Sequence, residues 1–539
     1  MMGLMQQRPL LISSLLEHAE LNHGEVEIVS CPVEGGTHRY TYADCARRTR
    51  KLAKALERLG VWDGDRVGTL AWNTWRHFEL FYAVPGMGAV CHTINPRLFD
   101  DQIAYIVNHA EDRFLFVDLT FVDLVERLID RLPSVEAVVI LTDAAHMPET
   151  SLPRVACYEE LLAAEDDDYA WRPLDENTAS SLCYTSGTTG EPKGVLYAHR
   201  STILHTLAAS LPDVHAFSSH DCILPVAPMF HANSWGIPYC AAAVGAKLVL
   251  PGRDVSGPRI HELMLQEGVT HSAAVPTIWL DFLNHVESTG DDTGKLDRVC
   301  VGGTAPPRSM IERFHRLGVQ VRQGWGMTEM SPMGTFGTLK RDMLDWPEAR
   351  KLDVLVKQGR PAFGVQIRIV DDNGRELPRD GRTYGLLQSR GPWVTSGYFK
   401  RDDTPIDEDG WFSTGDVATI DPRGFMQITD RAKDVIKSGG EWISSIELEN
   451  AAMGHPQVAE AAVIGVAHPK WDERPLLVVV AKGKPPGKQD LIDYLAGHVA
   501  KWWLPDDVQF VDELPHTATG KVQKTALRER FKDYALPTA

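Results

Sequence analysis

Tyr184-Thr185-Ser186-Gly187-Thr188-Thr189-Gly190-Glu191-Pro192-Lys193-Gly194 is the most informative segment of the sequence. It gathers four aliphatic hydroxyls, three glycines and a lysine directly after a short apolar run. Glycines let backbone N–H groups approach phosphate oxygens, while hydroxyls and an ammonium group add donors and positive charge. This density and order favour a phosphate-binding loop over an ordinary polar surface loop.

The position of the lysine excludes a P-loop NTPase. That class places its lysine directly before a Ser or Thr whose hydroxyl reaches Mg²⁺. Here Lys193 follows Pro192 and precedes Gly194. A different phosphate-binding architecture is therefore expected.

Strand-like and helical patterns alternate on the N-terminal side of this loop. Residues 113–118 and 137–143 are short apolar runs typical of buried strands, and a helical pattern at 121–132 lies between them. Such alternation predicts α/β layers with largely parallel sheets. At 539 residues the chain is also long enough for two or more domains.

The texture of the sequence changes from about residue 357, where Gly, Asp and Pro punctuate short strand-like runs. We expect a small β-rich subdomain over residues 357–430. A return to α/β patterns follows, including a helix at 490–500. The predicted organisation is an N-terminal domain over 1–430, a hinge at 431–433 and a C-terminal domain over 434–539.

Composition narrows the classes of partner. The formal net charge of −18 argues against nucleic acid or an anionic membrane surface as the main partner. The eight cysteines form no CxxC pair, which favours buried reduced thiols. No apolar stretch reaches the length of a membrane span, and the N-terminal apolar run is too short for a signal peptide. We expect a cytoplasmic protein.

The phosphate loop resembles that of the adenylate-forming superfamily, which includes acyl-CoA synthetases, peptide-synthetase adenylation domains and firefly luciferases. Further segments resemble the family's motifs and follow in its order: 228–235 (PMFHANSW), 302–305 (GGTA), 323–329 (QGWGMTE), 411–416 (WFSTGD), 430–433 (DRAK), 437–442 (KSGGEW) and 515–524 (PHTATGKVQK). The resemblance covers nearly the whole chain. It implies an α/β fold, in which a large N-terminal domain of layered sheets with a small β-rich subdomain is joined to a small mobile C-terminal α+β lid.

The resemblance also implies a nucleotide site. Its ATP- or AMP-binding residues would be Thr185, Ser186, Gly187, Thr188, Thr189, Gly190, Lys193, Gly303, Thr304, Gly324, Trp325, Thr328, Asp416 and Arg431. Thr185 and Glu329 would hold Mg²⁺, which typically takes one or two carboxylates plus phosphate oxygens. Lys521 would be the catalytic lysine, neutralising the attacking carboxylate and the α-phosphate.

By the same resemblance, residues for the acyl group and for coenzyme A can be placed. The acyl substrate would contact His231, Trp235, Gly302, Met330 and Pro332. His231 would act at the reaction centre as a gate to the CoA channel rather than as a general base, although a packed core residue is the alternative for His231 and for Trp235. Lys433 would be the hinge of the lid. The CoA channel would be bordered by Lys437, Ser438, Gly439, Gly440, Glu441 and Trp442, for which a simple β-turn is the alternative.

The implied reaction joins a small carboxylic acid to CoA through an acyl-adenylate, releasing AMP and pyrophosphate. The bulky His231, Trp235, Met330 and Met333 favour a short- to medium-chain acid. Overall likeness is greatest to bacterial medium-chain acyl-CoA synthetases, among them 3-methylmercaptopropionyl-CoA ligases, and relatives of this kind are commonly homodimers. The alternatives are a stand-alone adenylation enzyme that loads a carrier protein, a longer-chain fatty acyl-CoA ligase, a luciferase-type oxygenase and a nucleotide sensor.

Overall fold

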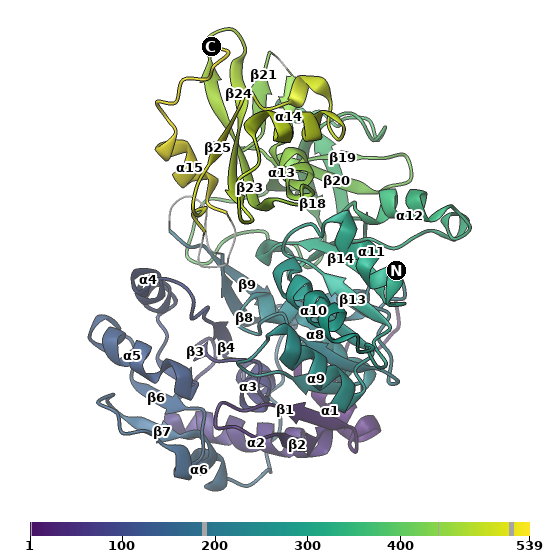
Figure 1. Ribbon diagram of the computed structural model, residues 1–539. Helices are drawn as coiled ribbons and strands as arrows, with labels where there is room; N and C mark the ends of the chain where they lie inside the picture. The colour runs from purple at the N-terminus through teal and green to yellow at the C-terminus, as the bar shows by residue number, and fades with distance from the viewer. Residues whose placement is uncertain (2, 186–190, 440, 517–521) are drawn as a thin grey trace. The chain divides into compact units, whose positions relative to one another are not determined.

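The computed structural model describes residues 1, 3–185, 191–439, 441–516 and 522–539 (Figure 1). The chain divides into two compact units. The first comprises Met1–Gln366 and Arg390–Phe412, and the second comprises Ile367–Ser389 and Ser413–Ala539.

The first unit contains a nine-stranded sheet that is parallel in its centre and antiparallel towards both edges. Its strands, in spatial order, are β16 (Arg360–Pro361), β15 (Met333–Phe336), β14 (Gln320–Gly326), β13 (Arg298–Val301), β12 (His271–Ala274), β10 (Cys222–Pro225), β11 (Lys247–Leu250), β1 (Glu27–Ser30) and β2 (His38–Thr41).

A seven-stranded sheet completes the strands of this unit, and only its last pairing, β8 with β9, is antiparallel. Its order is β7 (Val155–Cys157), β6 (Ala137–Ile140), β5 (Phe114–Val117), β3 (Arg66–Leu70), β4 (Val90–Thr93), β8 (Ala179–Tyr184) and β9 (Gly194–Ala198). The two predicted buried strands are β5 and β6, which pair in parallel. Between them lies α5 (Val122–Leu128), as the sequence predicts.

Helices of the first unit connect and cover these strands. They are α1 (Ser13–His23), α2 (Tyr42–Leu59), α3 (Trp75–Gly86), α4 (Asp100–Ala110), α5, α6 (Tyr158–Ala163), α7 (His199–Ala209), α8 (Ile237–Val244), α9 (Gly257–Glu267), α10 (Pro276–Thr289), α11 (Arg308–Arg316) and α12 (Glu348–Leu355).

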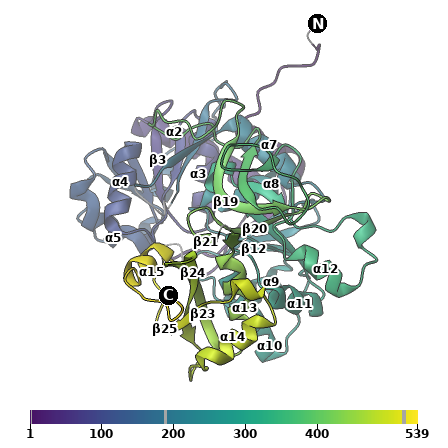
Figure 2. The ribbon, with the colours of Figure 1, turned by 90° about the horizontal axis from the view of Figure 1, so that it is seen from above.

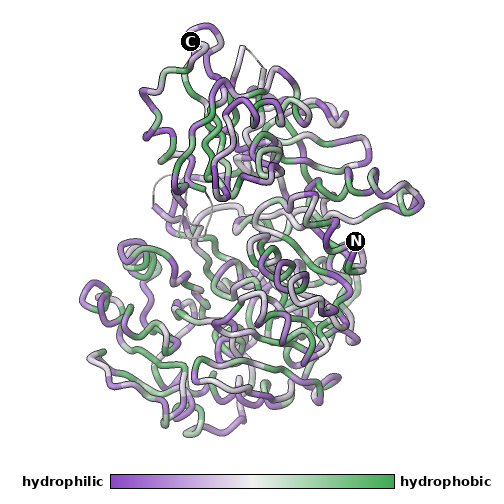
Figure 3. Tube along the Cα trace, viewed as in Figure 1, coloured by the Kyte–Doolittle hydropathy of each residue, from purple (hydrophilic) through white to green (hydrophobic). Residues whose placement is uncertain are grey.

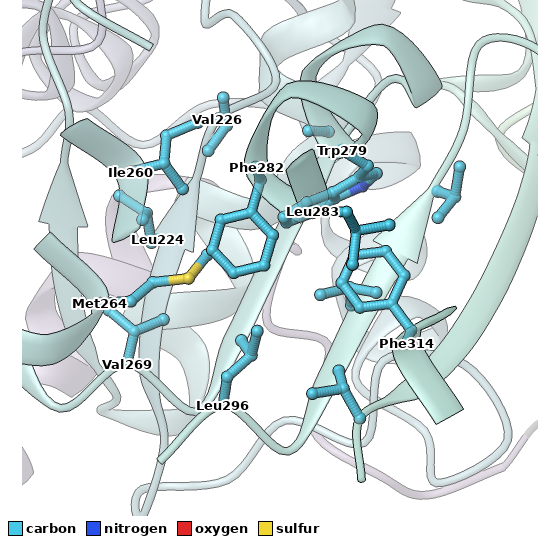
Figure 4. Close-up of a cluster of buried hydrophobic side chains, with 14 of the residues drawn as sticks. Leu224, Val226, Ile260, Met264, Val269, Trp279, Phe282, Leu283, Leu296 and Phe314 are labelled. Atoms are coloured by element: carbon cyan, nitrogen blue, oxygen red, sulfur yellow. The ribbon is translucent and has the colours of Figure 1, made fainter. Parts of the chain in front are cut away.

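A hydrophobic cluster fixes helices α9, α10 and α11 on the nine-stranded sheet. Figure 4 shows Trp279, Phe282 and Phe314 at its centre, with Ile260 and Met264 beside them. All five are inaccessible to solvent. Burying an aromatic or large aliphatic side chain contributes on the order of 2–3 kcal/mol. The cluster therefore holds strands β13 and β14 in place.

The second unit contains two sheets. One has the order β17 (Gln366–Val370), β18 (Gly385–Arg390), β19 (Phe412–Ile420) and β20 (Met426–Arg431). The other has the order β22 (Glu441–Ile443), β21 (Ile436–Ser438), β24 (Asp472–Ala481) and β23 (Val458–His468), with β25 (Asp507–Phe510) pairing β24. Its helices are α13 (Ser445–Met453), α14 (Lys488–Ala496) and α15 (Lys524–Arg530).

Alternation along β23 and β24 explains why helices cover both faces of the second sheet. Val463, Leu477 and Val479 pack in one cluster with residues of α13 and α14. Their neighbours Ile464, Leu476 and Val478 pack in another with Leu527 of α15. Side chains point to opposite faces at period two. Figures 1 and 2 show α13 and α14 together beside β23, and Figure 3 shows the hydrophobic stretches along these strands.

The predicted fold class is confirmed: a large unit of layered α/β sheets accompanies a small C-terminal α+β part. The four-stranded sheet β17–β20 falls almost wholly in the same compact unit as the C-terminal segment. The domain boundary at 431–433 stays a prediction. Among the described residues, no helix combines the length and apolarity needed to cross a bilayer. All eight cysteines are buried and free.

Candidate active site

The two ends of the phosphate loop meet where β8 passes into β9. Tyr184 pairs with Gly194 across these antiparallel strands. The Thr185 N–H then donates to the Lys193 carbonyl oxygen at 2.9 Å, which closes the loop at its base. The expected phosphate ligands Ser186, Gly187, Thr188, Thr189 and Gly190 lie outside the described residues.

Glu329, the expected Mg²⁺ ligand, lies in the short 3₁₀ helix η5 (Thr328–Met330) and is only 7% exposed. Two backbone contacts hold this turn. The Tyr197 hydroxyl of β9 donates to the Thr328 carbonyl at 2.7 Å. The Thr395 N–H donates to the Glu329 carbonyl at 2.7 Å. Strand β9, which follows the phosphate loop, therefore also fixes the turn that carries the carboxylate.

Tyr398, which the sequence did not single out, contacts both the Glu329 carboxylate and the Lys193 ammonium. The Tyr398 hydroxyl donates to Glu329 Oε1 at 3.0 Å. The Lys193 ammonium lies 4.7 Å from the centroid of the Tyr398 ring. Burial, reinforced by the Glu329 charge, raises the pKa of Tyr398, so its phenol stays protonated as a donor. Nothing in Gly397-Tyr398-Phe399 distinguishes this tyrosine from one in an ordinary loop.

A pocket of about 470 Å³ opens beside Glu329. Its lining comes from β9 and the start of α7 on one side and from residues 392–400 on the other. The lining includes Glu329, the hydroxyl-bearing Tyr197, Thr395 and Tyr398, and the aromatic Trp393. Such a combination of a carboxylate, hydroxyls and an aromatic surface suits a polar ligand.

Trp325 and Met330, expected at the adenine and acyl sites, converge over Gly334. A Cβ added at Gly334 would lie 2.6 Å from the Trp325 ring and 2.9 Å from Met330 Cε. Any larger residue would displace the indole. Gly324 faces the Phe336 ring in a similar way, with an added Cβ at 3.2 Å. The structure thus brings Trp325 and Met330 together near the end of β14, whereas Gly324 faces Phe336.

Pro332 follows η5 and is half-buried. Its carbonyl accepts from the Met327 N–H at 2.9 Å. A Cβ on Gly326 would lie 1.7 Å from that carbonyl oxygen, so only glycine fits there.

His231 precedes a turn, containing Trp235, whose backbone dihedral angles are uncommon. Ala232, Asn233, Ser234 and Trp235 all have positive φ, between 44° and 58°, within the 3₁₀ helix η4 (Ala232–Gly236). Consecutive non-glycine residues in this region are costly and mark a backbone that its surroundings hold in place. The His231 side chain is exposed, so the packed-core alternative is wrong for it.

Trp235 and Gly302, both expected at the acyl site, are in contact. A Cβ on Gly302 would lie 3.0 Å from Trp235 Cη2. Trp235 is half-buried, so both its role at the acyl site and the core alternative stay predictions. The neighbouring Gly303 and Thr304 are exposed and follow directly after β13.

The expected ribose ligands lie in the second unit, where Asp416 and Arg431 pair across β19 and β20. Arg431 Nε lies 3.0 Å from Asp416 Oδ1, and the Asp416 side chain is 4% exposed. Arg431 Nη1 also donates to the Thr414 carbonyl at 3.3 Å. A buried carboxylate is stabilised by such a partner, and the pair presents an acceptor beside a guanidinium.

The expected hinge and CoA-channel residues are in the second unit too. Lys433 is exposed. Lys437 and Trp442 pair across the hairpin of β21 and β22, with Lys437 Nζ 5.8 Å from the Trp442 ring centroid. Ser438 is buried and accepts from Arg474 Nη1 at 3.3 Å.

Gly439 follows Ser438 with a φ of 61°, and its N–H donates to the Trp471 carbonyl at 2.8 Å. The role of the segment stays a prediction. Gly440 lies outside the described residues, as does the expected catalytic residue Lys521; Glu441 is described only as the first residue of β22.

The His, Cys, Asp and Glu side chains can be examined for an arrangement that would bind a metal ion. Within the described part of the chain, no group of three or more His, Cys, Asp and Glu side chains is arranged to hold an ion. That excludes a preformed cage among these residues. A single buried carboxylate beside a phosphate loop fits Mg²⁺, which keeps waters and binds through substrate phosphates.

Comparison with known families gives two matches. The AMP-binding enzyme family matches residues 16–399, and the AMP-binding enzyme C-terminal domain family matches residues 447–521. Together they cover most of both units.

Individual relatives match over nearly the full length. A 3-methylmercaptopropionyl-CoA ligase of Ruegeria lacuscaerulensis is 51% identical, with 99% of both chains covered. A medium-chain-fatty-acid–CoA ligase of Ectopseudomonas oleovorans is 49% identical, with 99% of this chain and 98% of the other covered. Among solved structures, the anthranilate CoA ligase AuaEII in complex with anthranoyl-AMP superposes with a TM-score of 0.84 at 23% identity, covering 97% and 98% of the two chains, and this likeness concerns the fold.

Proposed function

We infer the reaction from sequence similarity together with the geometry of the site. The chain belongs to the AMP-binding enzyme family, and it is an ATP-dependent acid–CoA ligase that forms AMP. The observation that carries this conclusion is the identity of about half of all residues, end to end, with two CoA ligases that act on different acids. The carboxylate of the acid attacks the α-phosphorus of ATP, and pyrophosphate leaves. The CoA thiol then attacks the acyl-adenylate and AMP leaves.

For the first step, we assign the phosphates to residues 185–193 and adenine to the region of Gly324 and Trp325. Gly303, Thr304 and Thr328 would complete the nucleotide contacts, and Asp416 with Arg431 would bind the ribose. Charge accumulates on oxygens during this transfer, so positioning and electrostatic stabilisation should dominate catalysis. Support comes from the closed base of the loop at Thr185 and Lys193 and from the ion pair of Asp416.

Mg²⁺ is part of this proposal. Glu329, with Thr185, would hold the ion against the phosphate oxygens, and the ion would supply positive charge there. The assignment is supported by Tyr398, which contacts both the Glu329 carboxylate and the Lys193 ammonium beside the phosphate loop.

For the second step, the lid would turn about Lys433. The segment from Lys437 to Trp442 would then border the CoA channel, with His231 as the gate between that channel and the acyl site. The exposure of His231 and Lys433 supports roles that require access or movement.

The acid is proposed to be short to medium in length, with 3-methylmercaptopropionate as the first candidate. The contact of Trp235 with Gly302 supports a pocket of limited depth, because the indole occupies the space beside the strand end. The alternatives are a longer fatty acid and loading of a carrier protein in place of CoA. We also propose a cytoplasmic location, which the buried free thiols support, and a homodimer, which light scattering would test.

Lys521 provides the sharpest test of the two-step assignment. Lys521→Ala should lower acid-dependent pyrophosphate release by about 10²–10³-fold, the loss typical of one removed stabilising donor. Thioester formation from synthetic acyl-AMP and CoA should stay near the wild-type rate. An equal fall in both half-reactions would show that Lys521 does not act selectively in adenylation.

A further inference from the structure

Tyr398 joins two groups that the proposed adenylation step needs at a fixed spacing. Its hydroxyl contacts Glu329 Oε1 at 3.0 Å, and its ring lies under the Lys193 ammonium at 4.7 Å. The first partner comes from the turn after β14 and the second from the end of the phosphate loop. Neither β14 nor the loop is adjacent to Tyr398 in the sequence.

The position of Tyr398 is itself fixed by β9. Its side chain packs on the buried cluster of Cys183, Val195 and Tyr197. The N–H of the next residue, Phe399, donates to the Gly194 carbonyl at 2.8 Å. The tyrosine is therefore tied to the strand that leaves the phosphate loop, and a ring held in this way has little freedom to move away from either partner.

We propose that Tyr398 is a positioning residue for adenylation, orienting the Glu329 carboxylate towards a divalent cation and holding the Lys193 ammonium at the phosphate loop. The proposal rests on the proposed function. It assigns two separable tasks to one side chain: the hydroxyl serves the metal, and the ring serves the lysine.

The physical basis of the first task is the geometry of a carboxylate. Two oxygens carry about four lone-pair directions, so a carboxylate can accept from a phenol and also ligate a cation. A hydrogen bond to a charged acceptor is worth more than a neutral one. Fixing Glu329 before the ion arrives lowers the ordering cost of binding, as partners of metal ligands commonly do.

The second task follows from the flexibility of lysine. Lys193 carries its charge on a four-carbon stem with many rotamers, and fixing such a side chain is costly in entropy. The face of an aromatic ring attracts an ammonium group within about 6 Å. Tyr398 therefore restricts the rotamers of Lys193 beforehand, so less side-chain entropy is lost when a phosphate binds.

Two substitutions separate the tasks. Tyr398→Phe keeps the ring and removes the hydroxyl, while Tyr398→Leu removes both. For Tyr398→Phe we expect the Mg²⁺ concentration at half-maximal adenylation to rise about tenfold, the equivalent of one hydrogen bond to a charged group. Mn²⁺ affinity of the ATP complex, measured by electron paramagnetic resonance, should fall by a similar factor. ATP affinity in EDTA, measured by calorimetry, should not change.

For Tyr398→Leu we expect the same metal defect plus a fall of several-fold in ATP affinity in EDTA, because Lys193 loses its ring. Thioester formation from preformed acyl-AMP should be unchanged in both variants. Tyr169→Phe is the matched control, since Tyr169 donates to Glu57 Oε1 at the same 3.0 Å, and it should leave every readout at the wild-type value.

Unaltered Mn²⁺ affinity and Mg²⁺ dependence in Tyr398→Phe would overturn the assigned role of the hydroxyl. Identical ATP affinities of the Phe and Leu variants in EDTA would overturn the role of the ring. If the Leu variant fails to fold, the isosteric Phe variant still decides the role of the hydroxyl. Should the wild type activate no acid, the proposed function fails, while the binding measurements still decide the role of Tyr398.

Discussion

His205 packs against Gly236, the last residue of the turn that follows His231. A Cβ on Gly236 would lie 2.7 Å from His205 Cε1, so the imidazole packs directly on the end of that turn. The Trp393 ring stands edge-on to it, 6.0 Å away between centroids. His205 is 1% exposed, and its Nε2 has no hydrogen-bond partner among the residues that the structure describes. Burial lowers the pKa of His205 to about 3, so the ring is neutral in the folded state.

His205 should therefore make the first unit sensitive to acid. The unfolded chain takes up a proton near pH 6.5, whereas the folded chain does so only near pH 3. The contribution is fully present above pH 6.5 and is lost as pH falls from 6.5 towards 3, by about 1.4 kcal/mol per pH unit. The free energy of unfolding of His205→Gln, measured with urea between pH 7 and 4.5, should fall less steeply than that of the wild type.

The exposed His220→Gln is the control for this experiment and should keep the wild-type slope. Parallel curves for His205→Gln and the wild type would show that the imidazole is not neutral and buried.

Residues differ in how far their place could be read from sequence. Glu329 and Lys193 stand within motifs whose order resembles that of a known family. Tyr398 could not be found, because its hydrogen bond spans 69 residues and a tyrosine in a loop has many ordinary uses. The positive φ values after His231 were equally hidden, since Ala, Ser and Trp do not favour that region and Asn is the one residue of the four that is enriched there.

At the scale of elements, helices α13 and α15 are joined to the second sheet by a buried ion pair. Lys524 Nζ lies 2.7 Å from Glu449 Oε1, and the two side chains are 11% and 18% exposed. The Val463 N–H of β23 also donates to Glu449 Oε1 at 2.7 Å. Burial raises the pKa of Glu449, while the Lys524 charge opposes that rise. One carboxylate thus connects α13, α15 and β23.

Removing this carboxylate should destabilise the second unit. Glu449→Gln keeps the volume but takes the directly paired carboxylate away from the buried Lys524 ammonium, which typically costs about 3 kcal/mol. Differential scanning calorimetry should show a lower unfolding temperature. Glu529→Gln breaks the exposed pair with Lys532 and should change the unfolding free energy by less than about 0.5 kcal/mol. Equal effects of the two changes would contradict a stabilising role of the buried Glu449–Lys524 pair.

Elements were largely predictable where apolar periodicity is strong, as at β5 and β6. Their ends were less so. The predicted helix at 490–500 was wrong at both ends: α14 runs from Lys488 to Ala496. It stops where Gly497 follows, since glycine loses more backbone entropy in a helix than any other residue.

At the scale of the whole molecule, the sequence predicts one boundary at 431–433, while the compact units divide elsewhere. Contacts distant in sequence explain the difference. The Ser445 N–H donates to Asp430 Oδ2 at 2.6 Å, and both residues are buried. Composition and periodicity carry no signal for such a contact. The hinge at Lys433 therefore lies within one compact unit of this structure, and its movement stays a prediction.

The most direct test of the proposed activity is CoA-dependent AMP release from ATP across a panel of acids: acetate, propionate, butyrate, 3-methylmercaptopropionate, hexanoate, octanoate, palmitate and a cinnamate. We expect a maximum at 3-methylmercaptopropionate or butyrate, with palmitate inert. A maximum at palmitate or cinnamate would contradict the shallow acyl pocket. Absence of CoA-dependent turnover with every acid would contradict the assignment as an acid–CoA ligase.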